Sequence, residues 1–363
     1  MHISELDTPA LLVDVDVMER NLVRAAEYAR EHNLRLRPHT KTHKIPALGR
    51  RQLELGAAGL TVAKVGEAEV MAASGTPDLL VAYPIVGARK LQRLMALAAR
   101  VHITVAVDNI CTALQVSQLA QLAGQRVGIL AEVDVGLGRV GVTPDQAAGL
   151  AVELARLPGL EFEGIAFYPG HIKKMDEAGE AELARVNQVL AGVLDSVRRA
   201  GLEPRVVSGG STPALYSSHL VAGMNEIRPG TYIFNDKNTV VASACEWQDC
   251  AASVLCTVVS TAVKDQIVVD GGSKTFSSDR LGGGDGIGFG RIVEAPGAVF
   301  TKMNEEHGYI DVRNAERRFN IGETVRIIPN HVCAAVNLHE QIYGIRGEEV
   351  VETWKVEGRG KLQ

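Results

Sequence analysis

Short apolar runs alternate with amphipathic stretches through the first two-thirds of the chain. Each run is followed by a turn and then by a segment with apolar residues at spacings of three and four, which is typical of a helix with one buried face. In the stretch from residue 177 to 200, Leu183, Val186, Leu190, Leu194 and Val197 follow this spacing. The eight apolar runs are Leu34–His39, Ala58–Ala63, Leu79–Tyr83, Ile103–Val107, Val127–Val133, Leu160–Tyr168, Arg205–Gly209 and Glu226–Tyr232.

The number and order of these runs predict the fold class. Eight strand–helix units within roughly 200 residues are the content of a closed (β/α)8 TIM-type barrel, which is an α/β fold. An open, doubly wound parallel sheet has the same periodicity and stays as the alternative. We expect the barrel to span residues 15–241.

The pattern changes from about Ala242 onward, where long helices give way to short β-branched runs separated by Gly, Asn and Asp. This predicts a second, mostly β domain. We assign residues 1–14 and 242–363 to it, because the early apolar run Ala10–Val13 precedes the barrel and can return to join these strands. Glycine-rich loops are expected at residues 282–286 and 288–290. The expected strands are Val254–Val263, Gln266–Asp270, Tyr309–Val312, Glu323–Ile328 and Val350–Val356.

Composition excludes several classes of protein. The 363 residues carry 38 basic and 43 acidic side chains, for a net charge of -5, and 46% are hydrophobic, so we expect an ordered chain that does not bind nucleic acid. We expect no membrane span, because no apolar stretch approaches the length that a span needs. The first residues lack the basic and apolar regions of a signal peptide. The five cysteines form no CxxC pair, so we expect a reducing, cytoplasmic location.

Polar residues at the ends of the runs indicate the chemistry, because the active site of a (β/α)8 barrel collects at the carboxyl ends of its strands. The first run leads into Lys41, and a lysine at the barrel mouth can act as a Schiff-base nucleophile. The seventh run closes with Ser208–Pro213 and the eighth contains Arg228–Tyr232. Small residues at these two ends are typical of a phosphate site. A nucleophilic lysine together with a phosphate site implies pyridoxal 5'-phosphate.

The chain resembles the alanine-racemase-like, fold-type III enzymes that use pyridoxal phosphate, in the branch of the D-threonine aldolases and eukaryotic-type D-serine dehydratases. The resemblance implies a barrel, a β domain and a homodimer with active sites at the subunit interface. It rests on seven segments spread over nearly the whole chain. They are Leu6–Ala10, Arg37–Lys44, Asp134–Gly141, Ser208–Pro213, Arg228–Tyr232, Asp270–Lys274 and Pro329–Cys333.

The resemblance also implies roles for single residues. Lys41 would hold the cofactor, with Lys44 as the rival within the same motif. Arg139 would lie near the phenolic oxygen, Tyr168 would line the pyridine ring, and His171 would be an acid/base or water-positioning group. Arg228 matches the racemase position that faces the pyridine nitrogen. The full cofactor-binding set is Lys41, Arg139, Tyr168, Ser208, Gly209, Gly210, Ser211, Thr212, Arg228, Gly230, Thr231 and Tyr232.

A metal site is expected at His331 and Cys333, which follow the run Glu323–Ile328. On an extended chain, side chains two residues apart point to the same side and can bind one borderline-soft ion. A buried structural thiol is the alternative. The resemblance implies a divalent ion here, manganese or zinc, with magnesium as a further candidate. His307 is another possible site residue.

The expected reaction is retro-aldol cleavage of a D-β-hydroxy-α-amino acid to glycine and an aldehyde. Related aldolases carry Asp where Cys333 stands, whereas the dehydratases carry Cys, so dehydration of D-serine or D-3-hydroxyaspartate to a 2-oxo acid and ammonia stays open. Racemase activity and non-catalytic binding of pyridoxal phosphate are further alternatives. D-Threonine, D-phenylserine, D-3-hydroxyaspartate and D-serine all present the same α-amino, α-carboxyl and β-hydroxyl groups.

Overall fold

The computed structural model describes residues 1–281 and 288–363, and its internal contacts divide the chain into two compact units. Residues 24–230 and 360–363 form the first, called the barrel unit below. Residues 1–23 and 231–359 form the second, called the β unit. The glycine-rich loop expected at residues 282–286 lies outside the described residues.

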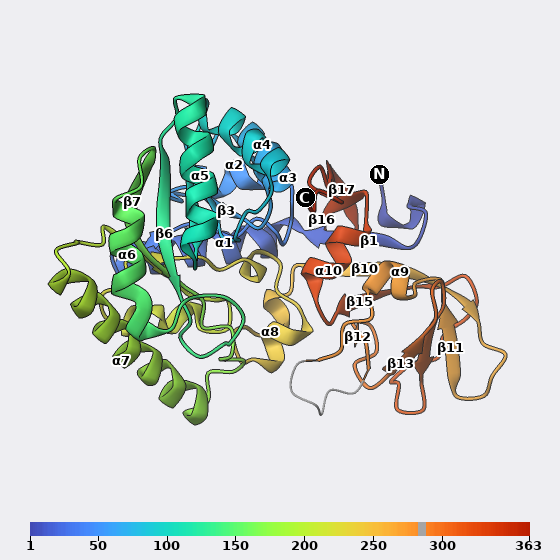
Figure 1. The fold of residues 1–363 in the computed structure, drawn as a ribbon. Helices are drawn as coiled ribbons and strands as arrows, with labels where there is room; N and C mark the ends of the chain where they lie inside the picture. The colour runs from blue at the N-terminus through green and yellow to red at the C-terminus, as the bar shows by residue number, and fades with distance from the viewer. Residues whose placement is uncertain (282–287) are drawn as a thin grey trace. The chain divides into compact units, whose positions relative to one another are not determined.

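The barrel unit contains eight parallel strands at the eight predicted apolar runs (Figure 1). Their spatial order is β2-β9-β8-β7-β6-β5-β4-β3, and a parallel bridge between His39 and Thr61 joins the two ends of this order. The closed barrel is therefore confirmed over the open sheet. The strands are β2 (Arg35–Leu36), β3 (Leu60–Val62), β4 (Asp78–Val81), β5 (His102–Val107), β6 (Val127–Val133), β7 (Leu160–Phe167), β8 (Val206–Gly209) and β9 (Glu226–Ile227).

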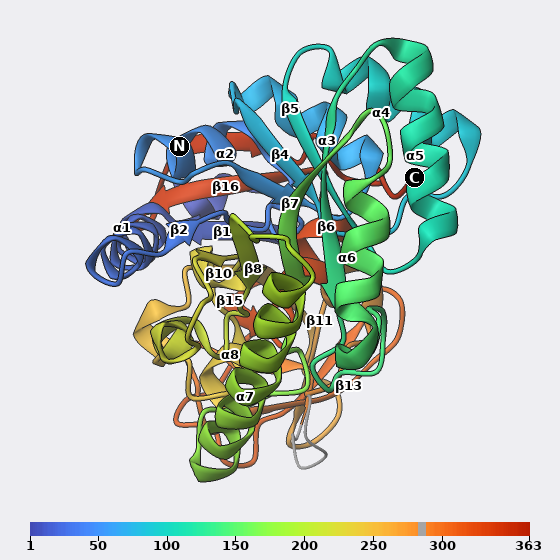
Figure 2. The ribbon, with the colours of Figure 1, turned by 60° about the vertical axis from the view of Figure 1, so that its left-hand side comes forward.

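Helices follow the strands at the predicted positions. In α7 the five residues at helical spacing, from Leu183 to Val197, are all buried. Its first turn is capped by the carboxylate of Asp176, which accepts the N–H of Gly179, while α6 packs on β6 and β7 (Figure 2). The helices are α1 (Val15–Glu31), α2 (Pro46–Glu54), α3 (Val65–Met71), α4 (Ala88–Ala98), α5 (Ile110–Ala123), α6 (Ala147–Ala155) and α7 (Glu177–Arg199).

The first and eighth strands are shorter than predicted. The run Leu34–His39 yields only the two residues of β2, and Glu226–Tyr232 yields only those of β9. Each run contains a proline, Pro38 or Pro229, which has no N–H for the ladder. As a consequence, Lys41 lies in a turn beyond the sheet rather than at a strand end, which corrects the sequence-based expectation.

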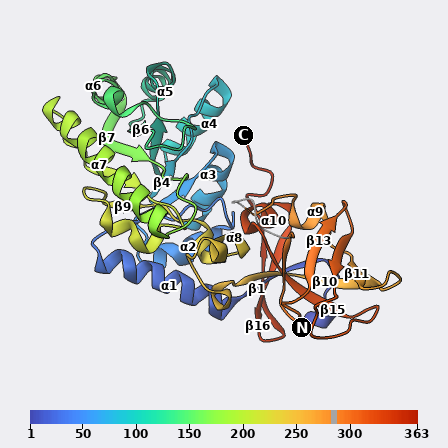
Figure 3. The same cartoon turned by 90° about the horizontal axis from the view of Figure 1, so that it is seen from below.

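In the part of the chain that the structure describes, the β unit contains a nine-stranded sheet, the first residues of α1 and the short helices α8 (Lys237–Val241), α9 (Ser273–Phe276) and α10 (Val332–Leu338). The early run forms β1 (Ala10–Asp14), which pairs antiparallel with β10 and parallel with β16, so its return to these strands is confirmed (Figure 3). The periodicity missed β12, β13 and β16. The remaining strands are β10 (Ala252–Ser260), β11 (Gln266–Val269), β12 (Gly290–Ile292), β13 (Val299–Met303), β14 (Gly308–Asp311), β15 (Thr324–Pro329), β16 (Gln341–Arg346) and β17 (Glu349–Lys355).

None of the helices in the described part of the chain combines the length and the apolarity that crossing a bilayer would require.

Candidate active site

The predicted cofactor residues of the barrel unit come from neighbouring strand ends. Tyr168 directly follows β7, Ser208 and Gly209 end β8, and Arg228 directly follows β9. The strands are parallel, so these residues lie at the same rim of the barrel.

The imidazole of His39, a residue that the sequence analysis did not select, is affected by the charges of three cationic side chains. Burial holds the pKa of His39 well below its usual value, and the positive charges of Lys41, Arg228 and Arg139 lower it further. Three residues expected to bind one cofactor, from the segments that follow β2, β6 and β9, therefore lie within electrostatic range of a single side chain. His39 is the residue that bridges β2 to β3, and its position at the end of the first run is the only sequence signal for it.

The two lysines of the motif have different environments. Lys44 Nζ lies 3.1 Å from Glu67 Oε1, and both side chains are buried. The second oxygen of Glu67 accepts the N–H of Ala63, so this carboxylate is fixed by two partners. Lys41 is exposed, and among the described residues its side chain makes no hydrogen bond or ion pair. An amine held in a buried ion pair is a poor nucleophile, so these contacts support Lys41 over Lys44 as the cofactor lysine.

The loops after β8 and β9 form a close backbone approach of the kind a phosphate requires. Thr212 Oγ1 accepts the N–H of Gly230 at 3.3 Å, which ties the two loops together. A Cβ on Gly230 would lie 3.0 Å from the carbonyl oxygen of His39, and one on Gly209 would lie 2.3 Å from the Phe167 ring. A side chain at position 209 would therefore clash with the ring, and one at position 230 would be tightly packed. Ser211 and Thr212 supply buried hydroxyl-bearing residues in the same loop, so the donors present fit a phosphate group.

Arg139 and Tyr168 contact each other, with the guanidinium carbon 5.0 Å from the ring centroid. The loop that carries Arg139 is shaped by Asp134, whose carboxylate accepts the N–H groups of Gly136, Leu137 and Gly138. Partial burial raises the pKa of Asp134, but these three bonds outweigh it and the pKa is lowered. The arrangement presents a cation and an aromatic face at one rim, as expected for residues that line a flat, anionic ring.

His171 has a carboxylate partner that the sequence did not indicate. Its Nε2 lies 3.3 Å from Glu182 Oε1 on α7, and the backbone of Gly136 packs against the ring, where a Cβ would approach to 3.2 Å. Both ring nitrogens of His171 are buried and make no hydrogen bond within the described residues, and Nδ1 also lacks the carboxylate contact that Nε2 has. A buried ring nitrogen without a partner is costly unless a ligand or water occupies its vicinity, so this atom fits an acid/base role.

Arg228 is buried inside the barrel. It donates from Nη1 to Ser208 Oγ at 2.6 Å and from Nη2 to the carbonyl oxygen of Phe167 at 2.9 Å. Burial lowers the pKa of Arg228, while the charges of Glu132 and Glu226 raise it. Glu132 is a second residue that the sequence analysis missed, because it is the one charged side chain within the apolar run that forms β6.

The predicted metal residues lie in the β unit, but not on an extended chain. His331 is the residue that precedes α10 and Cys333 is in its first turn, so the strand-based argument for their common direction is wrong. Their side chains nevertheless hydrogen-bond to each other, and this bond and the contact of His331 Nδ1 with Asp279 Oδ2, 2.8 Å away, raise the pKa of His331 to about 9 against the effect of burial. Thr231 Oγ1 lies 3.7 Å from Cys333 Sγ.

Residues 1–281 and 288–363 contain no group of three or more His, Cys, Asp or Glu side chains placed to hold a metal. Among the described residues, His331 and Cys333 are the two predicted ligands, and a site with two protein ligands leaves positions for water and substrate. Tyr232 is buried in the core of the β unit, while His307 is exposed in the turn between β13 and β14.

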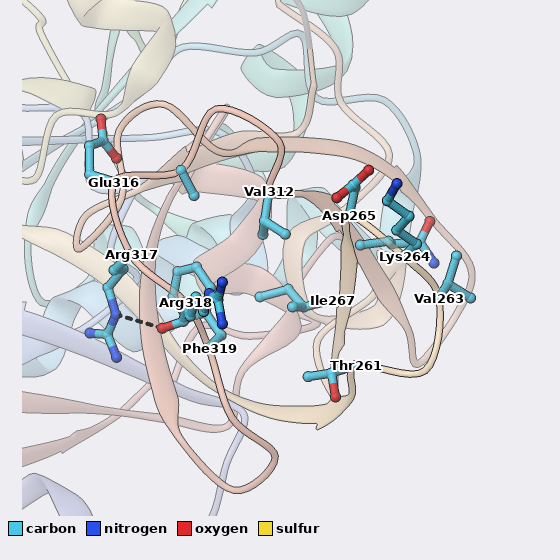
Figure 4. A pocket seen from close by; sticks show the side chains of 12 residues that line it. Thr261, Val263, Lys264, Asp265, Ile267, Val312, Glu316, Arg317, Arg318 and Phe319 are labelled. Atoms are coloured by element: carbon cyan, nitrogen blue, oxygen red, sulfur yellow. Dashed lines mark hydrogen bonds between the residues drawn. The ribbon is translucent and has the colours of Figure 1, made fainter.

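Figure 4 shows a pocket whose lining contains none of the site residues discussed above. It has a volume of about 550 Å³ and is lined by residues 261–267 and 312–319 of the β unit. Its basic side chains are already engaged in part, since Arg317 contacts Glu323 at 2.8 Å and the ring of Phe319. No predicted site residue lines this pocket, and we assign no chemistry to it.

Comparison with known families identifies the chain. The model of the alanine racemase N-terminal domain matches residues 13–238, and that of a putative serine dehydratase domain matches residues 251–345. The chain belongs to the alanine-racemase-like family of D-threonine aldolases and D-serine dehydratases.

The aldolases of this family are similar over the full length. D-Threonine aldolase of Arthrobacter sp is 33% identical, covering 99% of this chain and 94% of that protein. 3-Hydroxy-D-aspartate aldolase of Paracoccus denitrificans (strain Pd 1222) is also 33% identical, with the same two coverages. The crystal structure of D-threonine aldolase from Filomicrobium marinum superimposes with a TM-score of 0.93 at 33% identity, covering 99% of this chain and 98% of that one. Membership makes the protein a lyase of the fold-type III class, and supports pyridoxal phosphate as its cofactor.

A dehydratase of the family is similar to nearly the same degree. D-threo-3-hydroxyaspartate dehydratase of Delftia sp. (strain HT23) is 31% identical over 96% of this chain and 97% of that protein. Two solved structures of D-threo-3-hydroxyaspartate dehydratase contain a substitution by alanine. In one, which is metal-free, alanine replaces a cysteine. In the other, alanine replaces a histidine two positions before that cysteine. This spacing equals that of His331 and Cys333.

Proposed function

We propose that this protein is a pyridoxal-phosphate- and divalent-metal-dependent lyase that cleaves D-β-hydroxy-α-amino acids to glycine and an aldehyde. The observation that carries the proposal is that Lys44 is held by Glu67 in a buried ion pair, whereas Lys41 is exposed and its positive charge, like those of Arg139 and Arg228, lowers the pKa of His39. Residues 15–241 would bind the cofactor, and residues 1–14 and 242–363 would carry the metal. We further propose a cytoplasmic homodimer with active sites at the subunit interface, which light scattering of the purified protein would test.

Different residues of the barrel unit would bind different parts of the cofactor. Lys41 Nζ would hold it covalently, the loops around Thr212 and Gly230 would bind its phosphate, and Arg139 with Tyr168 would contact the ring. Arg228 would face the ring nitrogen, where a permanent cation disfavours a second positive charge. When bound, the cofactor supplies a sink for the electrons of the bond that breaks.

Two further groups would act on the substrate. His171 Nδ1, oriented by the contact of Nε2 with Glu182, would take the proton of the β-hydroxyl, and breaking the Cα–Cβ bond would then release the aldehyde. His331 and Cys333 would hold the divalent ion, which would supply Lewis acidity. Manganese and zinc are the preferred candidates, and magnesium is a third. Thr231 would support the thiolate through its hydroxyl.

Dehydration to a 2-oxo acid and ammonia is the second candidate. Cys333 favours it, because the dehydratase structures named above carry substitutions of a histidine and a cysteine at the same spacing. In that reaction Lys41 would remove the proton from Cα, and the β-hydroxyl would leave instead of losing its proton. Both reactions use the same side chains, so the products must distinguish them.

The deciding experiment is product analysis with D-threonine, pyridoxal phosphate and manganese or zinc. Glycine and acetaldehyde, absent with L-threonine and abolished by a chelator, are the expected result. Ammonia and 2-oxobutanoate would replace the aldolase assignment with the dehydratase. Turnover that survives chelation, or racemised threonine, would overturn both lyase assignments. If D-threonine is inert, the same assay with D-phenylserine, D-3-hydroxyaspartate and D-serine identifies the preferred side chain or, if all are inert, leaves non-catalytic cofactor binding.

A further inference from the structure

A chain of alternating charges crosses the interior of the barrel and ends at Arg228. Asp78 binds Arg37 through two hydrogen bonds of 2.8 and 2.9 Å. Arg37 Nε lies 2.8 Å from Glu226 Oε2, and Glu226 Oε1 accepts a 2.7 Å hydrogen bond from Ser208 Oγ. Ser208 Oγ in turn accepts the bond from Arg228 Nη1. Asp78, Arg37 and Glu226 thus alternate in charge, Arg35 lies 3.6 Å from the same oxygen of Glu226, and the neutral hydroxyl of Ser208 links Glu226 to Arg228.

The hydroxyl of Ser208 acts as a relay, by which we mean that it connects Glu226 to Arg228 through two hydrogen bonds. It donates its one proton to Glu226 and accepts from Arg228, in a position with no exposed surface. Glu226 is equally buried, so its charge is stabilised by Arg37 on one oxygen and by Ser208 on the other. Buried charges without such partners are strongly destabilising.

The two hydrogen bonds of Arg228 fix the plane of its guanidinium. Ser208 holds Nη1 and the carbonyl of Phe167 holds Nη2, so the group cannot rotate about its long axis. These bonds occupy two of the five N–H donors of an arginine and leave the others for a ligand. A guanidinium held in one plane can direct a particular N–H donor at a particular atom of a ligand.

We propose that Ser208 and Glu226 are positioning residues that hold Arg228 toward the ring nitrogen of the cofactor. The proposal rests on the function proposed above, because it requires that cofactor at this rim. Glu226 acts through Ser208 and supplies the negative charge that keeps a buried cation in one place. Arg37 and Asp78 complete the pairing of Glu226 but do not touch Arg228.

The chain offers a matched set of variants for the test. Ser208→Ala removes the relay and leaves the Glu226–Arg37 ion pair, whereas Ser208→Thr keeps a hydroxyl. Glu226→Gln removes the charge. Asp78→Asn weakens the far end of the same network without touching Ser208. Each protein is measured for its cofactor dissociation constant, for the visible absorption of the bound cofactor across the neutral pH range, and for thermal stability without cofactor.

We expect Ser208→Ala and Glu226→Gln to raise the cofactor dissociation constant about tenfold, because each weakens a hydrogen-bonded contact of a charged group. Both should also change the pH dependence of the cofactor absorption, which a merely structural role would not move. Ser208→Thr should restore the wild-type spectrum. Asp78→Asn should lower thermal stability while leaving the spectrum and the dissociation constant unchanged.

Two results would overturn the inference: a Ser208→Ala protein with the wild-type spectrum and affinity, or an Asp78→Asn protein with the same spectral change as Ser208→Ala. If Ser208→Ala does not fold, the comparison of Glu226→Gln with Asp78→Asn replaces it. The cofactor spectrum and dissociation constant should then change in Glu226→Gln and stay unchanged in Asp78→Asn. Failure of the proposed function has a different signature. In that case the wild-type chain would acquire no borohydride-reducible cofactor at Lys41.

Discussion

The hydroxyl of Thr231 lies 3.7 Å from the sulfur of Cys333, although the two residues are 102 positions apart. Asp236 stabilises the same region, because its Oδ2 accepts the N–H of Val332 at 2.9 Å while its Oδ1 caps α8. A residue expected to bind the cofactor and a residue expected to bind the metal are therefore held together within one unit. This contact connects two motifs that the sequence presents separately.

Thr231→Val should weaken the metal site. A hydroxyl that donates to the Cys333 thiolate stabilises it by about 1 kcal/mol, so its loss should raise the manganese concentration for half-maximal activity about fivefold. Thr231→Ser keeps the hydroxyl and is the matched control. An unchanged metal requirement in Thr231→Val would show that the contact does not support the thiolate.

Lys41 and Lys44 should respond to substitution in opposite ways. Lys41→Ala should abolish the borohydride-reducible attachment of the cofactor and leave stability unchanged, since the side chain is exposed. Lys44→Met should keep the attachment but lower the free energy of unfolding by about 3 to 5 kcal/mol, because it leaves the Glu67 carboxylate buried without its cation. Mass spectrometry of the reduced protein and urea unfolding test the pair. Attachment at position 44 would reverse the assignment.

Gly209→Ala should destabilise the barrel unit and weaken cofactor binding together. The new Cβ would lie 2.3 Å from the buried ring of Phe167, and overpacking of this kind costs about 1 to 3 kcal/mol. Gly149→Ala is the contrasting variant, because its Cβ would meet nothing within 4 Å and α6 should gain about 0.5 to 1 kcal/mol. Thermal unfolding of the two proteins provides the measurement. Equal shifts in both would contradict the close approach at β8.

Stability should fall in mild acid in part because of His43. Burial lowers the pKa of His43 from its ordinary value of 6.5 to about 4, while bonds with Gln52 and Ile45 partly oppose this effect. The unfolded chain therefore binds a proton more readily than the folded one, so this contribution is complete above pH 6.5 and is lost as pH falls toward 4. Between about pH 7 and about pH 5 the loss from this group is about 2 kcal/mol.

The check is the difference between wild type and His43→Gln. Urea unfolding at both pH values should show a smaller decline in the variant, because glutamine does not titrate. An equal decline in both proteins would mean that His43 is not held neutral in the folded state.

The barrel was predictable because its signal is local. Each strand buries an apolar run and each helix buries one face, so the period along the chain reports the element directly. The prolines at positions 38 and 229 shortened the first and eighth strands, which a pattern of apolar residues does not register. In the β unit the three-residue strand β12 was too short to produce any period, and α10 was read as extended chain.

The candidate site was predictable only in its list of residues. The motifs named Lys41, Arg228, His171 and Cys333, but their partners come from distant positions, such as Glu182 beside His171. Glu132 and Glu226 had no signal of their own, since a single charged residue in a strand has no characteristic spacing. Only the folded barrel shows that both carboxylates lie close enough to Arg228 for their charges to raise its pKa.

The order of polar and apolar residues was thus sufficient for the eight strands and the β domain, and the motifs along the chain were sufficient for the family to which it belongs. The tertiary structure decided which lysine is free of ion pairs among the described residues and which carboxylate faces which cation. It also decided which hydroxyl connects the two charged groups. The physical reason is that burial and ion pairing depend on distances between residues far apart in the chain. Periodicity carries no information about those distances.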